Sequence, residues 1–323
     1  MNQLYGITLG DSSGVGPEIL LKAFRNGEVQ HPIVVFGDIA ALAYYNDLLG
    51  YAVPLHPVTA PAHTPGGLAV IDPGILQPGQ ITPGKLNAKS GQAARANVVA
   101  ATKAALAHEI AAIVTLPMNK EATQMTDPAF VGHTELIGGV CGAEDVTIML
   151  VSDQLIVTHV STHCSLAEAI QRAKQPRIRT ILKLTSDAVS RLIDKPRIAV
   201  AGLNPHAGES GLFGTEEIDE IQPAVAWAQS QGMPIEGPLP PDTLFYMAVR
   251  RKRFDAIVCM YHDQGHIPLK LLDFEGGVNV ALGLPIIRTS VDHGTAFDIA
   301  GKGVAQTNSF VKALEFAVRL AAA

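Results

Sequence analysis

The chain has 323 residues, of which 47% are hydrophobic and 17% charged, and its formal net charge is −6. A chain of this length and hydrophobic content can bury a large core, which excludes intrinsic disorder and predicts about two domains. The acidic balance argues against a nucleic-acid-binding protein, which needs a basic surface, but leaves room for a local cationic pocket.

Short runs rich in Ile and Val alternate along the chain with longer Ala-rich stretches of helical character. Strands are predicted near residues 5–9, 32–36, 68–71, 111–115, 146–151, 155–159, 197–202, 255–260 and 278–280. Helices are predicted near residues 16–25, 39–49, 90–107, 166–193, 216–231, 242–250 and 308–321. This alternation is typical of an α/β fold with a largely parallel sheet, in which ligands bind at the carboxyl ends of the strands.

Two regions lie between these elements. The glycine-rich stretch from Leu9 to Ile19, LGDSSGVGPEI, is a strand-to-helix turn in which Pro17 suits the first helical turn. It lacks the third glycine of the dinucleotide fingerprint and the Gly-Lys-Ser/Thr of a Walker loop. The proline-rich stretch from Pro54 to Gly67 is predicted to be a long connection.

No apolar segment reaches the roughly 20 residues that a membrane-spanning helix requires. The N-terminus lacks the basic and apolar regions of a signal peptide. The chain has three cysteines, an odd number without a close pair: Cys141, Cys164 and Cys259. We therefore expect a cytoplasmic protein without a disulfide scaffold or a thiolate zinc site.

Three histidines share one placement, just beyond the end of a predicted strand: His163, His206 and His262. The carboxyl ends of parallel strands lie on one edge of a sheet, where three imidazoles can hold one divalent metal and leave a coordination position open. The alternative is that each histidine only caps a loop, because no local motif such as His-Glu-x-x-His is present. His31, His56, His63 and His108 lie in polar or loop contexts and are predicted to be surface residues.

Several other residues favour an anion site. The sequence GHTE, from Gly132 to Glu135, precedes an apolar stretch, so Thr134 is either a plain helix cap or part of an oxyanion site with His133. Arg288 follows the apolar LGLPII and needs an anionic partner, either an internal carboxylate or a substrate group. In MYHDQGHIPLK, from Met260 to Lys270, an apolar strand is followed by charged residues and a predicted Gln-Gly turn.

Four long motifs resemble the 4-hydroxythreonine-4-phosphate dehydrogenase family of vitamin B6 synthesis. They are GLNPHAGESGLFGTEE from Gly202, PPDTLF from Pro240, MYHDQGHIPLK from Met260 and GLPIIRTSVDHGTAFDIAGKG from Gly283. The similarity spans nearly the whole chain. The segment from His293 to Gly303 also looks like the loop of 3-isopropylmalate dehydrogenase that holds the adenosine of NAD.

The resemblance implies a role for each matching position. The metal ligands are His163, His206 and His262, with one of the three contributed across a homodimer interface. Substrate contacts are His133, Thr134, Lys270, Asn279 and Arg288. The cofactor residues are His293, Gly294, Thr295, Ala296 and Asp298. Asp242 and His206 are alternatives for the general base, Asp263 is expected to orient an imidazole, and His266 to be structural or cofactor-facing.

The implied fold has two α/β/α domains with the active site in the cleft between them, as in isocitrate and isopropylmalate dehydrogenases. We expect residues 1–125 and 285–323 to form the first domain. Residues 126–284 would form the second, with the metal ligands and the dimer interface. Neither nucleic acid nor a membrane is expected as a partner.

The reaction implied is oxidation of the C3 hydroxyl of a 4-phosphorylated four-carbon hydroxy acid by NAD, followed by loss of carbon dioxide. One divalent metal (zinc, or magnesium, manganese, cobalt or nickel) would polarise the oxygen being oxidised. The substrate is either 4-phosphohydroxythreonine, giving 3-amino-2-oxopropyl phosphate, or D-threonate or D-erythronate 4-phosphate, giving dihydroxyacetone phosphate. The sequence Gly-His-Ile-Pro at 265–268, and KLLDF and AFDIAGKG, resemble the second subgroup more.

Two other classes compete with this interpretation. A metal-dependent hydrolase needs three histidines and a water, but it has no use for a dinucleotide loop. A non-catalytic sensor of a sugar-acid phosphate would bind NAD without turnover.

Overall fold

The computed structural model describes residues 3–274 and 276–322. The chain divides into two compact units, one formed by the chain up to Glu144 together with Leu284–Ala322, the other by Asp145–Gly283. The first boundary differs from the one predicted after residue 125. Helix α5 (His133–Cys141) packs against α3 (Ala88–Leu106) and buries Ile137 in the core of the first unit, which explains the difference.

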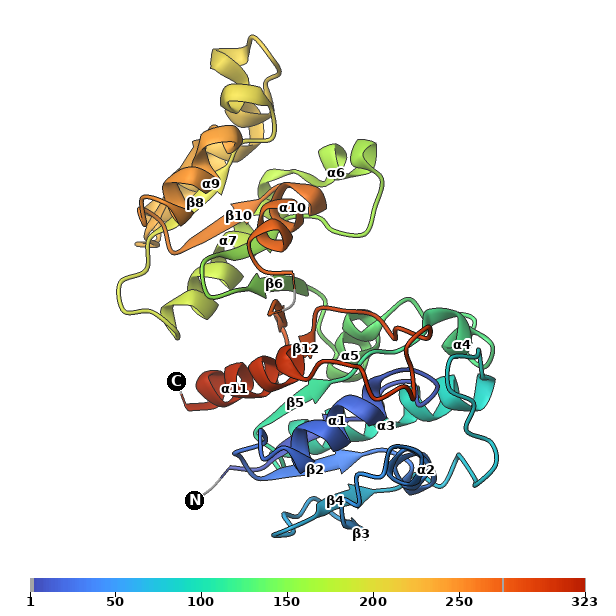
Figure 1. Cartoon of the computed structure of the whole chain (residues 1–323). Coiled ribbons are helices and arrows are strands. Elements are labelled where there is room, and N and C mark those ends of the chain that lie inside the picture. Colours follow the sequence, from blue (N-terminus) through green and yellow to red (C-terminus); the bar gives the residue numbers. More distant parts are fainter. Residues whose placement is uncertain (1–2, 275, 323) are drawn as a thin grey trace. The chain divides into compact units, whose positions relative to one another are not determined.

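The first unit contains a parallel sheet in the order β3-β4-β2-β1-β5-β12. Its strands are β1 (Tyr5–Thr8), β2 (Ile33–Phe36), β3 (Leu55–Pro57), β4 (Leu68–Ile71), β5 (Ala112–Thr115) and β12 (Arg288–Val291). Its helices include α1 (Gly16–Arg25), α2 (Ile39–Leu49), α4 (Lys120–Gln124) and α11 (Asn308–Ala322). Figure 1 shows these helices and strands as layers, with α3 packed on β1, β2 and β5.

The second unit contains a mixed sheet in the order β11-β6-β7-β10-β8-β9. Its strands are β6 (Thr147–Val151), β7 (Ile156–His159), β8 (Ile198–Ala201), β9 (Ile235–Leu239), β10 (Ala256–Cys259) and β11 (Val278–Leu282). Its helices include α6 (Leu166–Arg172), α7 (Gln175–Ser190), α8 (Gln222–Ser230), α9 (Pro241–Val249) and α10 (His262–Leu272). Strands β7, β10, β8 and β9 run parallel, whereas β6 is antiparallel to both β11 and β7.

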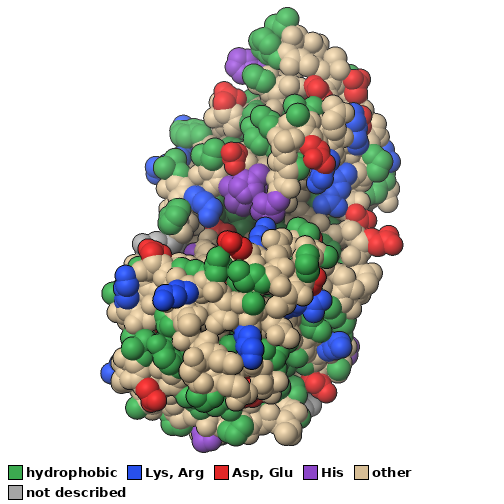
Figure 2. Space-filling view, turned by 90° about the vertical axis from the view of Figure 1, so that its right-hand side faces the viewer, with side chains coloured by type: hydrophobic (Ala, Val, Ile, Leu, Met, Phe, Trp, Pro, Cys, Tyr) green, Lys and Arg blue, Asp and Glu red, His purple; other side chains and the backbone are tan. Residues whose placement is uncertain are grey.

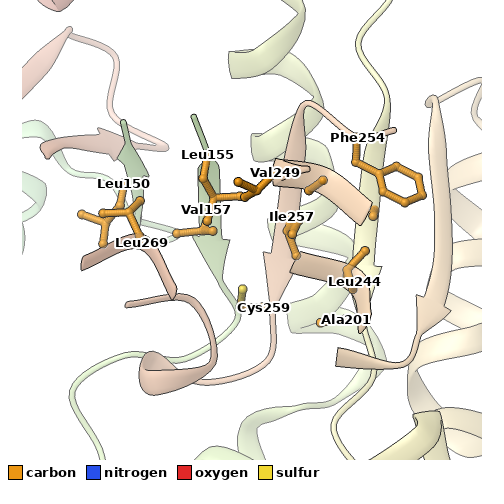
Figure 3. Packing of buried hydrophobic residues seen from close by; sticks show 12 residues of the cluster. Leu150, Leu155, Val157, Ala201, Leu244, Val249, Phe254, Ile257, Cys259 and Leu269 are labelled. Atoms are coloured by element: carbon orange, nitrogen blue, oxygen red, sulfur yellow. The ribbon is translucent and has the colours of Figure 1, made fainter. Parts of the chain in front are cut away.

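Apolar side chains from strands and helices meet in the core of this second unit (Figure 3). Val157 and Ile257 of the sheet pack with Leu244 of α9 and Leu269 of α10, and all four are fully buried. Burial of side chains this large contributes about 1.5–3 kcal/mol each. The strand ends that carry the histidines are therefore fixed by a well-packed layer behind them.

All nine predicted strands are present within two residues of the expected positions, so the predicted α/β class is confirmed. Strands β3, β9 and β12 were not predicted. β3 and β9 contain proline, and β12 begins with a buried arginine, so none of the three has the apolar run that indicates a strand.

Three helix predictions need correction. The stretch 166–193 forms two helices, because Pro176 has no N–H with which to continue the first. The stretch 216–231 opens with a π-helical turn, Glu217–Ile221, before α8. Helix α5 begins at His133 after Gly132, with no side-chain cap, so Thr134 lies inside the first turn and is not the cap.

The predicted turn after Met260 is wrong, because His262–Leu272 forms helix α10 with Pro268 inside it. Gly265 allows this helix to lie close to the sheet. A Cβ at this position would lie 2.5 Å from His159 Nε2 and 2.9 Å from Cys259 Sγ. The glycine that suggested a turn is therefore required for close packing.

Candidate functional site

The strands that precede the three predicted metal ligands are neighbours in the second unit. Strand β10 pairs in parallel with β7 on one side and with β8 on the other. Their carboxyl ends therefore lie on one edge of the sheet, as predicted. His163, His206 and His262 each follow one of these ends.

His163 and His262 lie together at this edge. Their ring centroids are 5.7 Å apart, and both side chains line a pocket of about 320 Å³. The other lining residues are Thr162, Cys164, Leu166, Ala169, Tyr261 and Asp263. Figure 2 shows histidine side chains gathered at the surface of the molecule. Two imidazoles beside an open pocket can contribute two ligands to a metal.

His206 lies in a turn of unusual backbone conformation. His206, Ala207, Glu209 and Ser210 all have positive φ, between 45° and 57°, and Gly208 among them has φ 81°. Left-handed backbone costs a residue with a Cβ roughly 1–2 kcal/mol, so four such residues in one turn store strain. Strain of this kind persists where surrounding contacts hold it, and it is common at functional sites.

Glu217, which is 1% exposed, holds the residues just before this turn. Its Oε1 accepts hydrogen bonds from the backbone N–H of Leu203 and of Asn204, each at 2.7 Å, and its Oε2 accepts one from Asn204 Nδ2 at 3.0 Å. A Cβ at Gly208 would lie 2.7 Å from Glu217 Oε2, so the turn closes directly over the carboxylate. Sequence reasoning missed Glu217, although an acidic residue after a glycine-rich loop could have indicated it.

Two of the three histidines have a carboxylate on Nδ1. Asp263 Oδ1 lies 2.7 Å from His262 Nδ1, and Glu209 Oε2 lies 2.9 Å from His206 Nδ1. A carboxylate in this position fixes the proton on Nδ1 and leaves the Nε2 lone pair available, as in carboxylate–histidine–metal sites. Asp263 therefore contacts His262, and its orienting role stays a prediction.

The described part of this single chain brings together no group of three metal-binding side chains. His206 contacts Glu209 and the ring of Phe213, whose centroid lies 6.1 Å away. Within one chain, therefore, His163 and His262 are adjacent.

Two further histidines support His262 from behind. His266, on the next turn of α10, stacks on His262 with ring centroids 3.6 Å apart, and its Nδ1 lies 3.0 Å from the His262 carbonyl oxygen. His159, fully buried at the end of β7, lies 4.6 Å from His266. Burial, together with His266 and His262, holds the pKa of His159 well below its usual range, so it is neutral.

Three of the predicted substrate residues lie in the first unit. His133 and Thr134 are in the first turn of α5, and Arg288 is the first residue of β12. Arg288 is 3% exposed, and its Nε and Nη2 donate to Thr115 Oγ1 at 3.1 and 2.7 Å. Burial lowers the pKa of Arg288 to about 10, with Glu135 opposing the shift, so the guanidinium stays charged.

His133 is close enough to Arg288 to sense its charge. Burial, and then Arg288, lower the pKa of His133 to about 3, and its Nε2 is buried without a hydrogen bond. A buried cation, a neutral imidazole and a helix N-terminus therefore meet in this unit. Such a group is suited to binding an anion.

The remaining predicted residues are more scattered. In the second unit, Lys270 lies on α10 with Nζ 5.4 Å from the Phe274 ring centroid, and Asn279 lies on β11 with a buried Oδ1 that has no hydrogen bond. Asp242 is exposed in the first turn of α9. In the first unit, the predicted cofactor residues occupy the loop between β12 and α11, where His293, Gly294 and Asp298 are exposed and Thr295 and Ala296 half-buried.

Comparison with known proteins defines the class. The chain is 44% identical to the D-threonate 4-phosphate dehydrogenase of Cupriavidus necator, over 98% of this chain and 96% of that protein. It is 43% identical to the 4-hydroxythreonine-4-phosphate dehydrogenase of Beijerinckia indica subsp. indica, over 97% and 94%. The crystal structure of 4-hydroxythreonine-4-phosphate dehydrogenase from Klebsiella pneumoniae superposes with a TM-score of 0.90 at 42% identity, covering 99% of both chains.

A β-decarboxylating dehydrogenase from Thermococcus kodakarensis, 12% identical with a TM-score of 0.51, shares the fold. The fold and the relatives together define an enzyme of the dehydrogenase class, an oxidoreductase. Residues 28–317 match the family model of the pyridoxal phosphate biosynthetic protein PdxA, and the chain belongs to this family. No helix among the described residues is long and apolar enough to cross a membrane.

Proposed function

We propose that the protein oxidises the C3 hydroxyl of a 4-phosphorylated four-carbon hydroxy acid, using NAD and one divalent metal, and that the product then loses carbon dioxide. The observation that carries the proposal is the pairing of His262 with Asp263 and of His206 with Glu209. In both pairs Nε2 would serve as the metal ligand, and a hydrolytic or sensing role does not account for the dehydrogenase relatives.

The metal would be held by His163 and His262 of one protomer and by His206 of the partner subunit. The 5.7 Å between the first two rings leaves room for an ion, and the fixed Nδ1 protons orient the ligands. Neutral nitrogen ligands favour zinc, cobalt or nickel over calcium. When bound, such an ion acts as a Lewis acid toward the oxygen being oxidised.

Arg288, His133 and Thr134 are proposed to bind the anionic end of the substrate, because they supply a buried cation and helix N–H donors. Lys270 and Asn279 are proposed as the remaining substrate contacts. Hydride would pass to the nicotinamide of NAD, whose adenosine the loop from His293 to Asp298 would bind. Asp242 and His206 are the proposed alternatives for the general base.

For the substrate we propose D-threonate or D-erythronate 4-phosphate. The Gly-His-Ile-Pro sequence at 265–268 supports this choice, because it resembles that subgroup, and its His266 stacks on the proposed ligand His262. The relative named D-threonate 4-phosphate dehydrogenase is 44% identical to this chain. The amino analogue, 4-phosphohydroxythreonine, is the alternative, supported by a relative at 43% identity.

A homodimer is supported by exposed apolar side chains on or just beyond the elements that carry the proposed ligands. On α10 and just beyond it, Ile267, Leu271 and Phe274 are 62%, 85% and 72% exposed, and Leu212 after the His206 turn is 72% exposed. Apolar patches of this kind mark interaction surfaces. A second copy would cover them and bring its His206 to this chain's His163 and His262.

The first experiment measures NADH formation by metal-reconstituted protein with the three phosphorylated substrates offered in parallel. Preference for the sugar acids supports the proposal, and turnover of the amino substrate alone moves the protein to the alternative. A chelator should abolish activity, and zinc or cobalt should restore it. If the protein binds NAD and metal but forms no NADH with any of the three substrates, the proposed substrate class is contradicted.

Sharing of the metal site is tested by mixing two inactive variants. A dimer of His163→Ala with His206→Ala has one intact site, so random assortment should restore about a quarter of wild-type activity. Mixing His163→Ala with His262→Ala should restore none, because both ligands come from the same protomer. Recovery in both mixtures, or in neither, would refute this assignment.

Leu271→Lys should weaken the dimer in sedimentation, whereas Leu106→Lys on α3 should not.

A further inference from the structure

In the glycine-rich loop from Leu9 to Gly16, four backbone amides donate hydrogen bonds inside the protein. The N–H of Asp11 donates to the Pro117 carbonyl at 2.8 Å, and the N–H groups of Ser13 and Gly14 donate back to Asp11 at 2.8 and 2.9 Å. An anion cradle requires unused N–H groups that converge on one point. These amides are already used inside the protein.

The next amide of the loop points elsewhere. The N–H of Val15 donates to the Thr295 carbonyl at 3.0 Å, which joins the loop to the segment between β12 and α11. A Cβ at Gly14 would lie 2.7 Å from that same carbonyl oxygen, so only glycine allows this approach. On the other side, the N–H of Gly84 donates to the Ser13 carbonyl at 2.8 Å.

Helix α1 holds the same segment a few residues further on. Glu18 is fully buried, and its carboxylate accepts hydrogen bonds from the N–H of Gly301 at 3.1 Å and of Ala305 at 2.8 Å. One turn along α1, Lys22 Nζ donates to the carbonyls of Ala305 at 2.8 Å and Gly303 at 3.3 Å. Figure 1 shows the segment that follows β12 beside α1.

A carboxylate and an ammonium on one helix therefore bind N–H and carbonyl groups of one loop. Charge-assisted hydrogen bonds are about twice as strong as neutral ones, and a buried carboxylate is costly unless its oxygens are used. The left-handed φ angles of Gly301 and Gly303, 75° and 74°, give the loop the shape in which these groups meet Glu18 and Lys22.

We propose that Glu18 and Lys22 are positioning residues that hold the 293–305 loop in the conformation that binds the dinucleotide. Neither residue is proposed to touch the cofactor. The inference rests on the proposed function, because it takes this loop as the NAD site. It assigns the Pro-Glu of the N-terminal motif to loop positioning.

The test is Glu18→Gln, which keeps the shape of the side chain but removes its charge. One amide oxygen accepts where two carboxylate oxygens did, and we expect NAD to bind about tenfold more weakly, with kcat nearly unchanged at saturating NAD. Lys22→Met should act in the same direction. Glu109→Gln, an exposed carboxylate of the same unit, serves as the control and should leave NAD binding unchanged.

Hydrogen exchange separates this inference from the proposed function. In Glu18→Gln the amides of Gly301 and Ala305 should exchange faster, whether or not the protein uses NAD. Unchanged exchange of these two amides would overturn the proposal. Faster exchange with unaltered NAD affinity would also overturn it, because the contacts would then be only structural. Absence of NAD binding by the wild-type protein would instead contradict the proposed function. Wild-type NAD affinity in Glu18→Gln with kcat reduced would also count against the inference.

Discussion

The neutral state of His133 leads to a pH dependence that can be worked out. The pKa of His133 is lowered from 6.5 to about 3 in the folded protein, by burial and by Arg288. Below pH 6.5 the unfolded chain therefore binds a proton that the folded chain does not. The stability contributed by this group is complete above pH 6.5 and is lost as pH falls toward 3.

Between pH 8 and pH 5 the linkage amounts to about 2 kcal/mol, and because the residue is only half-buried we expect about 1–2 kcal/mol. The variant His133→Gln lacks the titrating ring and should lose that much less stability over this range. The other histidines, including His159, contribute equally to both proteins and cancel in the comparison.

The measurement must report on the first unit by itself. The only tryptophan, Trp227, lies in the second unit, so hydrogen exchange of the β5 amides at pH 5 and pH 8, corrected for the intrinsic exchange rates, is the better probe. His108→Gln, which removes an exposed histidine of the same unit, is the control and should behave like the wild type. Equal pH dependence of the wild type and His133→Gln would refute the argument that burial keeps this imidazole neutral.

Two further predictions concern buried contacts. Thr115→Val removes the acceptor of two hydrogen bonds from the buried Arg288, so calorimetry should show a loss of stability of about 1–3 kcal/mol. Kinetics should show a raised KM for the phosphorylated substrate. An unchanged stability would mean that the guanidinium is satisfied elsewhere. Gly265→Ala forces a methyl group to within 2.5 Å of His159 Nε2, so calorimetry should show a loss of about 1–3 kcal/mol. Gly139→Ala on α5 meets open space and should be neutral or stabilising by up to about 1 kcal/mol, so similar effects of the two changes would refute the packing argument.

The apolar runs of the sequence were enough to predict the sheet strands that are buried on both faces. Residues 5–8, 112–115 and 256–259 are entirely buried, and a strand of that kind is a short apolar run in any context. The same apolar runs predicted that His163, His206 and His262 follow neighbouring strand ends, because the carboxyl ends of parallel strands lie at one edge of the sheet.

Tertiary contacts decided the features that local sequence could not predict. Gly265 lies inside a helix because His159 and Cys259 are close beneath it, although Gln-Gly in isolation favours a turn. Residues 133–141 join the first unit because Ile137 is buried against α3, and nothing within that segment indicates which core it enters.

The same holds for the groups that hold functional loops in place. Glu18 meets Gly301 and Ala305 across more than 280 positions of chain, and Glu217 closes the left-handed turn of His206 through backbone N–H groups. Sequence determines which residues are apolar, charged or able to bind a metal, because those properties belong to each side chain. Which buried carboxylate meets which backbone amide depends on the packing of the whole unit, and only the tertiary structure decides it.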